Sequence, residues 1–486
     1  MKKEELFEVL SDIDQVEVEK AKDYTVTKKH RRLKWTIPAV CAAAALLGIG
    51  AFFMFKGRDK DISSGSSGSR TQSAEIVRYM ASYPAPTASQ MTAEQFVNGD
   101  AHYYWWERYV DTTDKTRSLS SEMSGYYSSL MKLLLVSDDE NTVCSPLNTY
   151  VAFSMLAEVT DGNTRKQILD MLGVSDIDTL RRNVKALWES NYVDTPIMKS
   201  LLANSLWLSN TFDYNTDTLN RLAADYYASS FSGTPGSEDM NKALKEWVDS
   251  NTGGLLKEYT ADMSLDSRTI LEMVSTIYFK AKWATEFDEG STTDETFHGT
   301  KGDKNVKMMH MSEMSSVYQG DNFTVLAVPL ADSGNMYFYL PKEGVAVNNL
   351  ASDPEVIKSL TDADIDKSWA HPMVNMSIPR FKISGKSDLT ETIKKLGVTD
   401  VLDPETADFS PLSEKSDELF LSKADHAAML EINENGVTGA AFVDMGICGA
   451  AMSTDVIDFV LDRPFMFAVT GYDGSLLFSG IVRNIE

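Results

Sequence analysis

Residues 435–454 read NGVTGAAFVDMGICGAAMST, and the interpretation of the whole chain depends on this stretch. It contains a single charged residue, Asp444, although the chain has a formal net charge of −25. Glycine interrupts it too often for a helix, and it is too apolar for an ordinary exposed loop. Counted from Val437, every second residue is apolar or glycine, whereas the alternate set contains Asp444. Such alternation predicts a segment that can become a strand over a core.

The predicted inward set is Val437, Gly439, Ala441, Val443, Met445 and Ile447. A slip of one residue would bury Asp444, so the pattern also specifies the register. The small residues at 439–441 favour insertion, because they can thread between two strands without a steric block. A half-buried strand or a merely apolar loop is the alternative interpretation.

The composition limits the possible functions. A chain of 486 residues, 43% of them hydrophobic, can form one large domain or two to three average ones. The acidic charge argues against nucleic acid as a partner. Three cysteines without CxxC spacing and six scattered histidines indicate neither disulfides nor a metal site. HExxH and GxSxG signatures are absent from the sequence, and we expect no cofactor and no enzymatic activity.

Residues 35–55 read WTIPAVCAAAALLGIGAFFMF and contain no charge. A helix of this length measures roughly 31 Å, which matches the hydrocarbon core of a membrane at about 30 Å. The basic residues that precede it are Lys28, Lys29, Arg31, Arg32 and Lys34. This charge bias predicts a cytoplasmic N-terminus and an external C-terminal part. A cleaved signal peptide is the alternative, although the 34 residues before the span are long for one.

The sequence therefore predicts four parts. Residues 1–34 form a cytoplasmic segment and residues 35–55 a transmembrane helix. Residues 56–117 form a tether and N-terminal extension, with a Gly/Ser-rich stretch followed by the aromatic cluster HYYWWERY at 102–109. Residues 118–486 form the main domain, in which helical patterns come first and strand patterns later. Because helices and strands are segregated rather than alternating, an α+β fold is favoured.

From about residue 118 to 486 the chain resembles a serpin, because several distinctive stretches occur in the family's order. They are NTVCSPLNTYVAFSMLAEVTDGNTRKQI (141–168), SLDSRTILEMVSTIYFKAKWATEFD (264–288), MSIPRFKISGKSDLTETIKKLGV (376–398), HAAMLEINENG (426–436) and DRPFMFAVTGYDGSLLFSGIVRNIE (462–486). The resemblance implies a large central mixed β-sheet with further sheets and a helical face. In inhibitory serpins a protease cleaves the reactive loop, which then inserts into the main sheet with the protease attached.

The resemblance also implies a hinge at the start of the loop and a polar cluster that controls sheet opening. The hinge residues are Glu434, Gly436, Val437, Thr438, Gly439, Ala440 and Ala441. The cluster residues are Ser145, Asn148, Ser275 and His426, with Trp283 where insertion starts. The chain departs from the family's usual loop at two positions: Val437 replaces Thr or Ser, and Phe442 is bulky where small residues are usual. Both departures concern the efficiency of inhibition rather than the fold.

Within the cluster, the family usually has Ser at position 148 and Asn at position 275, and this chain has the reverse. A reciprocal exchange preserves the number of donors and acceptors, so we expect Asn148 and Ser275 to touch, with His426 nearby. Two unrelated neutral changes are the alternative.

The reactive bond is placed by counting along the loop. Counting forward from Gly436 by the family's spacing gives Ala450–Ala451, our first choice. Counting back from Pro464 places the bond after Ser453, so candidates extend from 449 to 454, and Met452–Ser453 is our second choice. All candidates are small or unbranched apolar residues, and no basic residue occurs between 435 and 454. An elastase-like pocket therefore suits the loop better than a trypsin-like one.

These observations predict an extracellular serine protease inhibitor that acts as a suicide substrate against elastase-like proteases. We expect a monomer, held in a cell membrane by a single N-terminal helix. The acidic leader at residues 6–24 is similar to those of Gram-positive bacterial membrane proteins, which favours a bacterial origin. A non-inhibitory serpin that acts as a surface binding or structural protein is the alternative.

Overall fold

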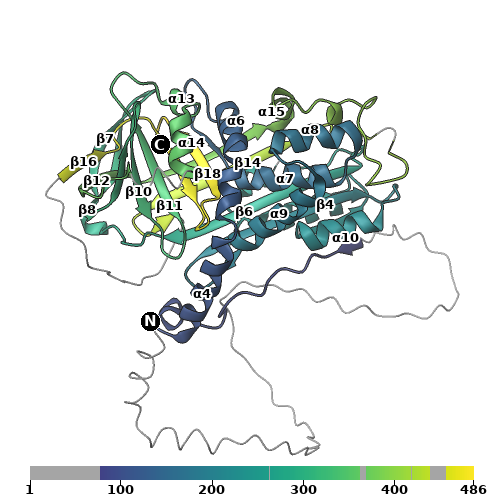
Figure 1. Ribbon diagram of the computed structural model, residues 1–486, viewed down its shortest axis with the longest axis horizontal. Coiled ribbons are helices and arrows are strands. Elements are labelled where there is room, and N and C mark those ends of the chain that lie inside the picture. Colours follow the sequence, from purple (N-terminus) through teal and green to yellow (C-terminus); the bar gives the residue numbers. More distant parts are fainter. Residues whose placement is uncertain (1–76, 262, 362–367, 417–418, 438–455, 486) are drawn as a thin grey trace, which may run out of the picture. The chain divides into compact units, whose positions relative to one another are not determined.

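The computed structural model describes residues 77–261, 263–361, 368–416, 419–437 and 456–485 (Figure 1). The predicted cytoplasmic segment, the span at 35–55 and the tether up to residue 76 lie outside these residues. Within the described ranges, no helix has the length and apolar character needed to cross a membrane.

Within the described residues, three β-sheets and a set of helices confirm the α+β class. The main sheet has eight strands in the order β1-β5-β4-β6-β15-β14-β13, with β3 paired to β4. It is mixed, because β4 and β5 are parallel whereas β4 and β6 are antiparallel. Its strands are β1 Val77–Tyr79, β3 Val193–Asp194, β4 Lys199–Ser209, β5 Ala228–Gly233, β6 Leu271–Lys282, β13 Phe381–Asp388, β14 Asp425–Asn433 and β15 Gly436–Val437.

Two smaller sheets complete the β-structure. The six-stranded sheet contains β2 Thr142–Cys144, β18 Leu476–Val482, β17 Phe465–Thr470, β11 Asn335–Pro341, β10 Phe323–Pro329 and β9 Ser316–Gln319, in that order. The four-stranded sheet contains β16 Val456–Val460, β12 Met373–Pro379, β8 Gly302–Met314 and β7 Thr293–Gly299. Because β16 follows the predicted reactive loop and β15 precedes it, the two ends of the loop are fixed in different sheets.

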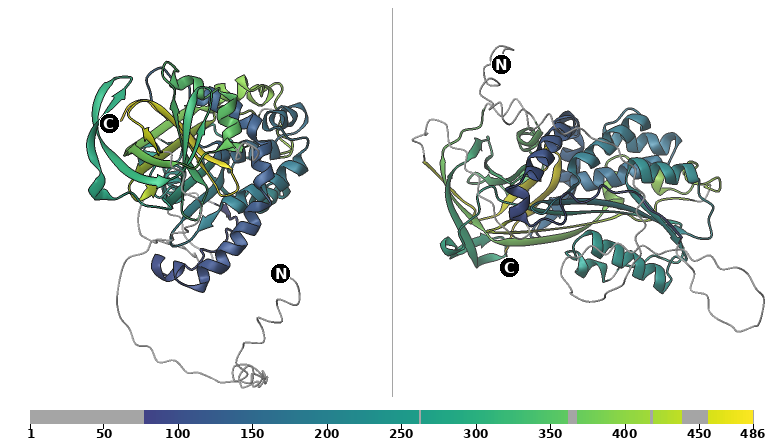
Figure 2. Two further views of the ribbon diagram at one scale, coloured as in Figure 1. Left: turned by 60° about the vertical axis from the view of Figure 1, so that its left-hand side comes forward. Right: turned by 90° about the horizontal axis from the view of Figure 1, so that it is seen from below.

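The helices cover both faces of the main sheet (Figures 1 and 2). They are α3 Ala93–Val97, α4 Asp100–Asp114, α5 Arg117–Glu122, α6 Ser124–Leu134, α7 Pro146–Glu158, α8 Gly162–Leu172, α9 Ile177–Asn191, α10 Thr216–Asp225, α11 Glu238–Asn251, α12 Lys257–Thr260, α13 Val347–Leu350, α14 Pro354–Thr361 and α15 Leu389–Lys395. Helices α7 and α9 contact one face, and α11 contacts the other through β4 and β6.

Alternation along β4 shows how the sheet separates two cores. Leu206 is buried in the large core on the side of α9, whereas its neighbour Trp207 is buried in a smaller core beneath α11. Twelve of the thirteen residues of α7 are buried. A helix that is surrounded on all sides is expected to lack a polar face. Helix α7 contacts β6, and Asn148 in its first turn bonds to Ser275 of that strand, so the start of α7 lies against the main sheet.

The N-terminal extension, residues 77–117, is part of the folded unit rather than a separate stalk. Strand β1 pairs with β5 at the edge of the main sheet. Phe96, Trp105 and Tyr109 are buried in the large core, and Trp105 and Tyr109 lie four residues apart on one face of α4. From Val77 onward, the described residues of the extension thus belong to the same compact unit as the residues after 118.

Candidate functional site

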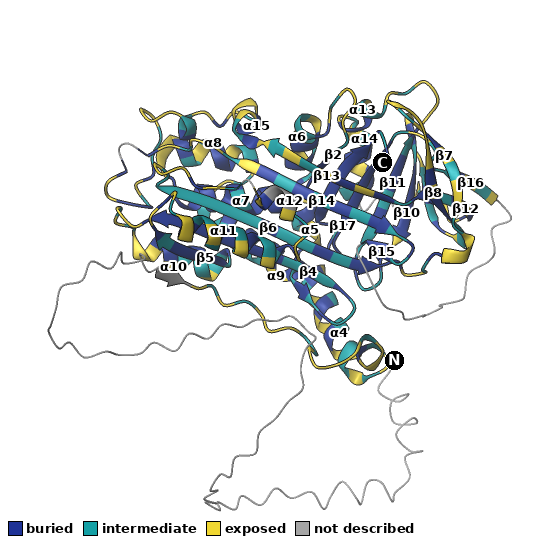
Figure 3. Cartoon of the chain, turned by 180° about the vertical axis from the view of Figure 1, so that it is seen from behind, coloured by how far each residue is buried: buried dark blue, intermediate teal, exposed yellow. Residues whose placement is uncertain are grey.

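Strand β15 is the part of the main sheet that joins β6 to β14. It consists of Gly436 and Val437, which pair with β14 on one side and with Lys282 and Ala281 of β6 on the other. Only the C-terminal end of β6 pairs with β15, and the rest of the strand extends back to Leu271. Strands β6 and β14 are both fully described, yet they form no ladder with each other (Figure 3). A strand that continued from β15 would therefore lie between β6 and β14 and could pair with both.

Gly436 can occupy its position only because it lacks a side chain. Its φ is +133°, and an added Cβ would lie 2.4 Å from the Ala281 carbonyl oxygen and 2.7 Å from the Lys282 Cα. Val437, the first residue of the predicted inward set, is 0% exposed and belongs to the large core. The remaining hinge residues (Thr438, Gly439, Ala440 and Ala441) and both candidate reactive bonds (Ala450–Ala451 and Met452–Ser453) lie outside the described residues.

The turn that leads into β15 is fastened by a buried carboxylate. Glu434 is 2% exposed and accepts hydrogen bonds from Arg380 Nε at 2.6 Å and from Thr292 Oγ1 at 2.5 Å. Burial raises the pKa of Glu434, but these hydrogen bonds outweigh it and hold the pKa below its usual range. Next to it, the indole N–H of Trp283 donates to the Asn433 carbonyl oxygen at 2.8 Å.

Asn148 and Ser275 touch, as their exchanged residue types predict. The Asn148 amide donates to the Ser275 carbonyl oxygen at 3.0 Å, and the Ser275 hydroxyl donates to Asn148 Oδ1. Sequence reasoning missed a further member of the polar cluster, Asn204, whose Oδ1 lies 2.7 Å from the Ser275 hydroxyl. Asn204 in turn donates to the Tyr226 carbonyl oxygen at 2.6 Å. Asn204 could have been found only from the register of β4 and β6, in which it lies opposite Ser275.

His426 is bonded to Ser145, the residue that precedes α7. The Ser145 backbone N–H donates to His426 Nε2 at 3.0 Å, so the ring is neutral with its proton on Nδ1. The imidazole is buried, and burial lowers its pKa to about 4. The start of α7 thus binds β6 through Asn148 and β14 through Ser145. These two strands flank the position that a continuation of β15 would take.

The family model described as Serpin (serine protease inhibitor) matches residues 125–485. The chain belongs to the serpin family.

Curated relatives support this assignment over most of their length. Human neuroserpin is 28% identical over 382 residues, which cover 73% of this chain and 88% of that protein. The horse leukocyte elastase inhibitor is 29% identical over 367 residues, with coverage of 72% and 95%. The crystal structure of tengpin, a thermophilic serpin, in its native state matches with a TM-score of 0.65 and 25% identity. That match covers 76% of this chain and 94% of tengpin.

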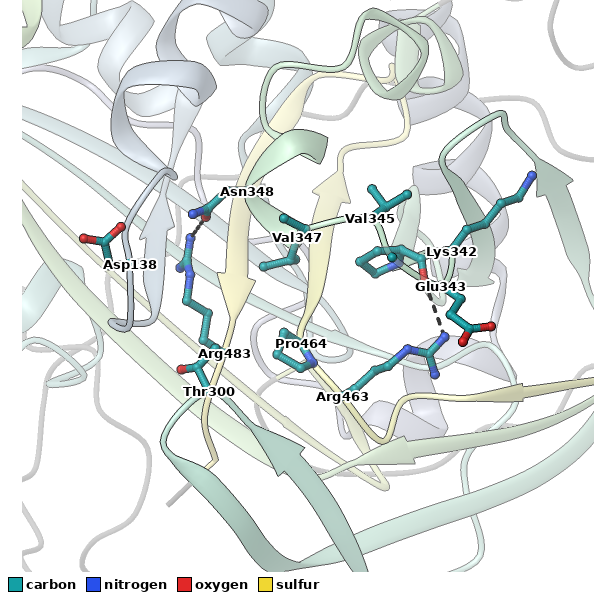
Figure 4. Close-up of a pocket in the computed structure, with 13 residues that line it drawn as sticks. Asp138, Thr300, Lys342, Glu343, Val345, Val347, Asn348, Arg463, Pro464 and Arg483 are labelled. Atoms are coloured by element: carbon teal, nitrogen blue, oxygen red, sulfur yellow. Dashed lines mark hydrogen bonds between the residues drawn. The ribbon is translucent and has the colours of Figure 1, made fainter.

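A pocket of about 670 Å³ lies elsewhere in this serpin, beside the first residues of β17 and the end of β18 (Figure 4). Two guanidinium groups line it, and both are already bonded to protein oxygens. Arg483 donates to Asn348 and to the Leu135 carbonyl oxygen. Arg463 donates to the Pro341 carbonyl oxygen at 3.4 Å and forms an ion pair with its sequence neighbour Asp462 at 3.0 Å. These bonds favour a structural role, in which the two arginines join neighbouring segments of the fold.

The Asn148–Ser275 contact can be tested with a double-mutant cycle. We expect Asn148→Ser alone to lower the free energy of unfolding of the uncleaved serpin by about 1–3 kcal/mol, because both hydrogen bonds between the buried Asn148 amide and the half-buried Ser275 are lost. The combined variant, Asn148→Ser with Ser275→Asn, should recover most of this loss, since donors and acceptors are again matched. Denaturant unfolding measures the free energy of unfolding of the single and the combined variants. Strictly additive effects would contradict an energetic coupling across the contact.

Acid should weaken the uncleaved serpin through His426. Its folded pKa of about 4 lies below its ordinary value of about 6.5, so below that value the unfolded chain binds more protons. Its contribution to stability is fully present above about pH 6.5 and is lost as the pH falls toward 4, by roughly 3 kcal/mol in total. Glu434, whose pKa is also depressed, acts in the same direction at lower pH.

Melting temperatures between pH 7.5 and 4 measure this effect. The matched control is His426→Gln, whose amide oxygen can still accept from the Ser145 N–H without titrating. The variant should show a shallower loss of stability between pH 6.5 and 4. An unchanged slope in the variant would show that His426 does not cause the loss.

Proposed function

We propose that this serpin inhibits serine proteases as a suicide substrate, with Ala450–Ala451 as the bond cleaved and Met452–Ser453 as the second candidate. The position of β15 carries the proposal. The chain leaves β15 with Val437 buried, between two strands that are not paired with each other. From Val437 onward, the alternating sequence provides the side chains that a strand in this position needs.

Elastase-like proteases are the proposed targets, because the loop offers small apolar residues and no basic one. The similarity to a leukocyte elastase inhibitor supports the same class. We further propose that the molecule is a single-pass membrane protein of bacterial origin and a monomer, with residues 1–34 cytoplasmic and the serpin domain extracellular. The uncharged span at 35–55 and the basic residues before it support this location.

A non-inhibitory serpin remains the second candidate, since Val437 and Phe442 depart from the residues common in inhibitory members. Thyroxine-binding globulin has the same fold, with a TM-score of 0.63 and 25% identity, and it was solved in complex with thyroxine. A non-inhibitory serpin would be cleaved in the reactive loop without trapping the protease.

Incubation with elastase separates the two candidates. An inhibitor gives a covalent complex that survives denaturing gel electrophoresis, whereas a non-inhibitory serpin gives a clipped band alone. Elastase with its nucleophilic serine replaced is the negative control, because it cannot form the acyl bond. Trypsin is the specificity control and should not cleave between 435 and 454. Mass spectrometry of the released C-terminal fragment identifies the bond, and cleavage outside 449–454 would contradict the proposed site.

A further inference from the structure

Helix α4 of the N-terminal extension contacts the turn between β10 and β11. His102 Nε2 lies 2.9 Å from Asp332 Oδ2, and the two side chains are only 12% and 14% exposed. The hydrogen bond to Asp332 raises the pKa of His102, although burial opposes it, so the pair is stronger than an exposed one. Asp332 has a φ of +55°, which places its side chain on a tight turn that the surroundings hold in place.

The same turn is bonded to the end of β6 that holds the hinge. The Ala331 N–H donates to the Lys282 carbonyl oxygen at 2.9 Å, and Leu330 forms a β-bridge with Trp283. Lys282 is the residue that pairs with Gly436. A short path of bonds therefore leads from α4 through the turn to the point where the reactive loop leaves the sheet.

The extension is held firmly enough to restrain this turn. The buried ring of Phe96 packs edge-on against His102, with centroids 5.4 Å apart. Trp106 packs against Tyr472 at 5.0 Å, in the turn between β17 and β18. Two residues after the end of α4, the Thr116 hydroxyl donates to the buried carboxylate of Asp473 at 3.0 Å. These contacts fix α4 at both ends, so the His102–Asp332 pair joins two ordered elements.

We propose that the N-terminal extension positions the hinge end of β6 and thereby slows the entry of a new strand between β6 and β14. This inference rests on the proposed function, because it concerns the step in which the loop enters the sheet. His102 and Asp332 are positioning residues that act through Lys282 and Trp283. With the pair intact, β6 is restrained on the side away from β14. With the pair broken, the turn is free to move with β6, and a new strand enters faster.

The experiment measures how fast a synthetic peptide of residues 438–447, which starts after the last residue of β15, enters the main sheet of the uncleaved full-length protein. Incorporation is followed by the mobility of the complex on native gels. The test variant is Asp332→Asn, which keeps the size of the side chain and tolerates a positive φ. A second variant, His102→Gln, breaks the pair from the other side. The matched control is Asp111→Asn, which breaks the exposed Asp111–Lys115 ion pair on the same helix.

We expect both test variants to incorporate the peptide about five to ten times faster than the parent, which corresponds to about 1–1.4 kcal/mol, and the control to match the parent. A purely structural role would lower the melting temperature of cleaved and uncleaved forms alike and leave the rate unchanged. Equal rates in parent and test variants would overturn the inference and leave the proposed function intact. A parent that never incorporates the peptide, and gains no stability on cleavage, would overturn both.

Discussion

Cleavage of the reactive loop should raise the melting temperature of this serpin by at least about 10 °C. The freed loop would add a strand between β6 and β14, starting from the two residues that already pair there. Burial of a Val, Met or Ile side chain contributes about 1.5–3 kcal/mol. The inward set contains Val443, Met445 and Ile447 beyond the hinge, and the new ladder adds backbone hydrogen bonds on two sides.

The size of the temperature shift follows from the entropy of unfolding. A domain of roughly 400 residues loses about 0.8 kcal/mol of stability per degree near its midpoint. A shift of about 10 °C therefore corresponds to a net gain of about 8 kcal/mol. Few other changes to a folded protein have an effect of this size.

Calorimetry of intact and elastase-cleaved protein measures the shift, and two adjacent substitutions test its cause. Val443→Asp places a charge on the predicted inward face and should abolish most of the gain, because the carboxylate would be buried without a partner. Phe442→Asp places the same charge on the outward face and should leave the gain intact. If the cleaved protein melts at the temperature of the intact one, the loop does not insert.

The features of this site that depend on a local sequence pattern could be predicted from the sequence. Alternation from Val437 onward predicts which side chains face inward, and Val437 is indeed buried. The exchange of residue types at 148 and 275 predicts a contact because two positions changed together, and the hydrogen bonds are present. The loop between 438 and 455 and the span at 35–55 stay predictions, since they lie outside the described residues.

Contacts that depend on how distant elements dock were not predictable. Asn204 joins the polar cluster because the β4–β6 register places it opposite Ser275, and no local pattern specifies that register. The docking of the N-terminal extension was missed for a similar reason. Aromatic residues at 105 and 109 indicate a buried face on α4, but they do not reveal what covers it. His102 finds its partner Asp332 at a separation of 230 residues.

Replacement of Val437 by arginine should convert this serpin from an inhibitor into a substrate. Val437 is 0% exposed and lies opposite Ala281 of β6 and Ile432 of β14. A guanidinium group in this position would be buried without a carboxylate partner, which costs several kcal/mol. The arginine would displace β15 from its place between β6 and β14. Insertion would then have to start from an unpaired loop, so its first step is slowed. The protease then completes hydrolysis of the acyl bond before it is displaced.

Titration of a fixed amount of elastase with increasing serpin measures the outcome. Because each 1.4 kcal/mol in a barrier changes a rate about tenfold, the number of serpin molecules consumed per elastase inhibited should rise by at least about tenfold in Val437→Arg. Val437→Thr is the matched control, since it retains the branched shape and carries no charge, and it should inhibit at least as well as the parent. The variant must remain folded before cleavage, which an unchanged circular dichroism spectrum establishes. If Val437→Arg inhibits with the parent's stoichiometry, insertion does not start at this hinge, and the loop must move by a different route.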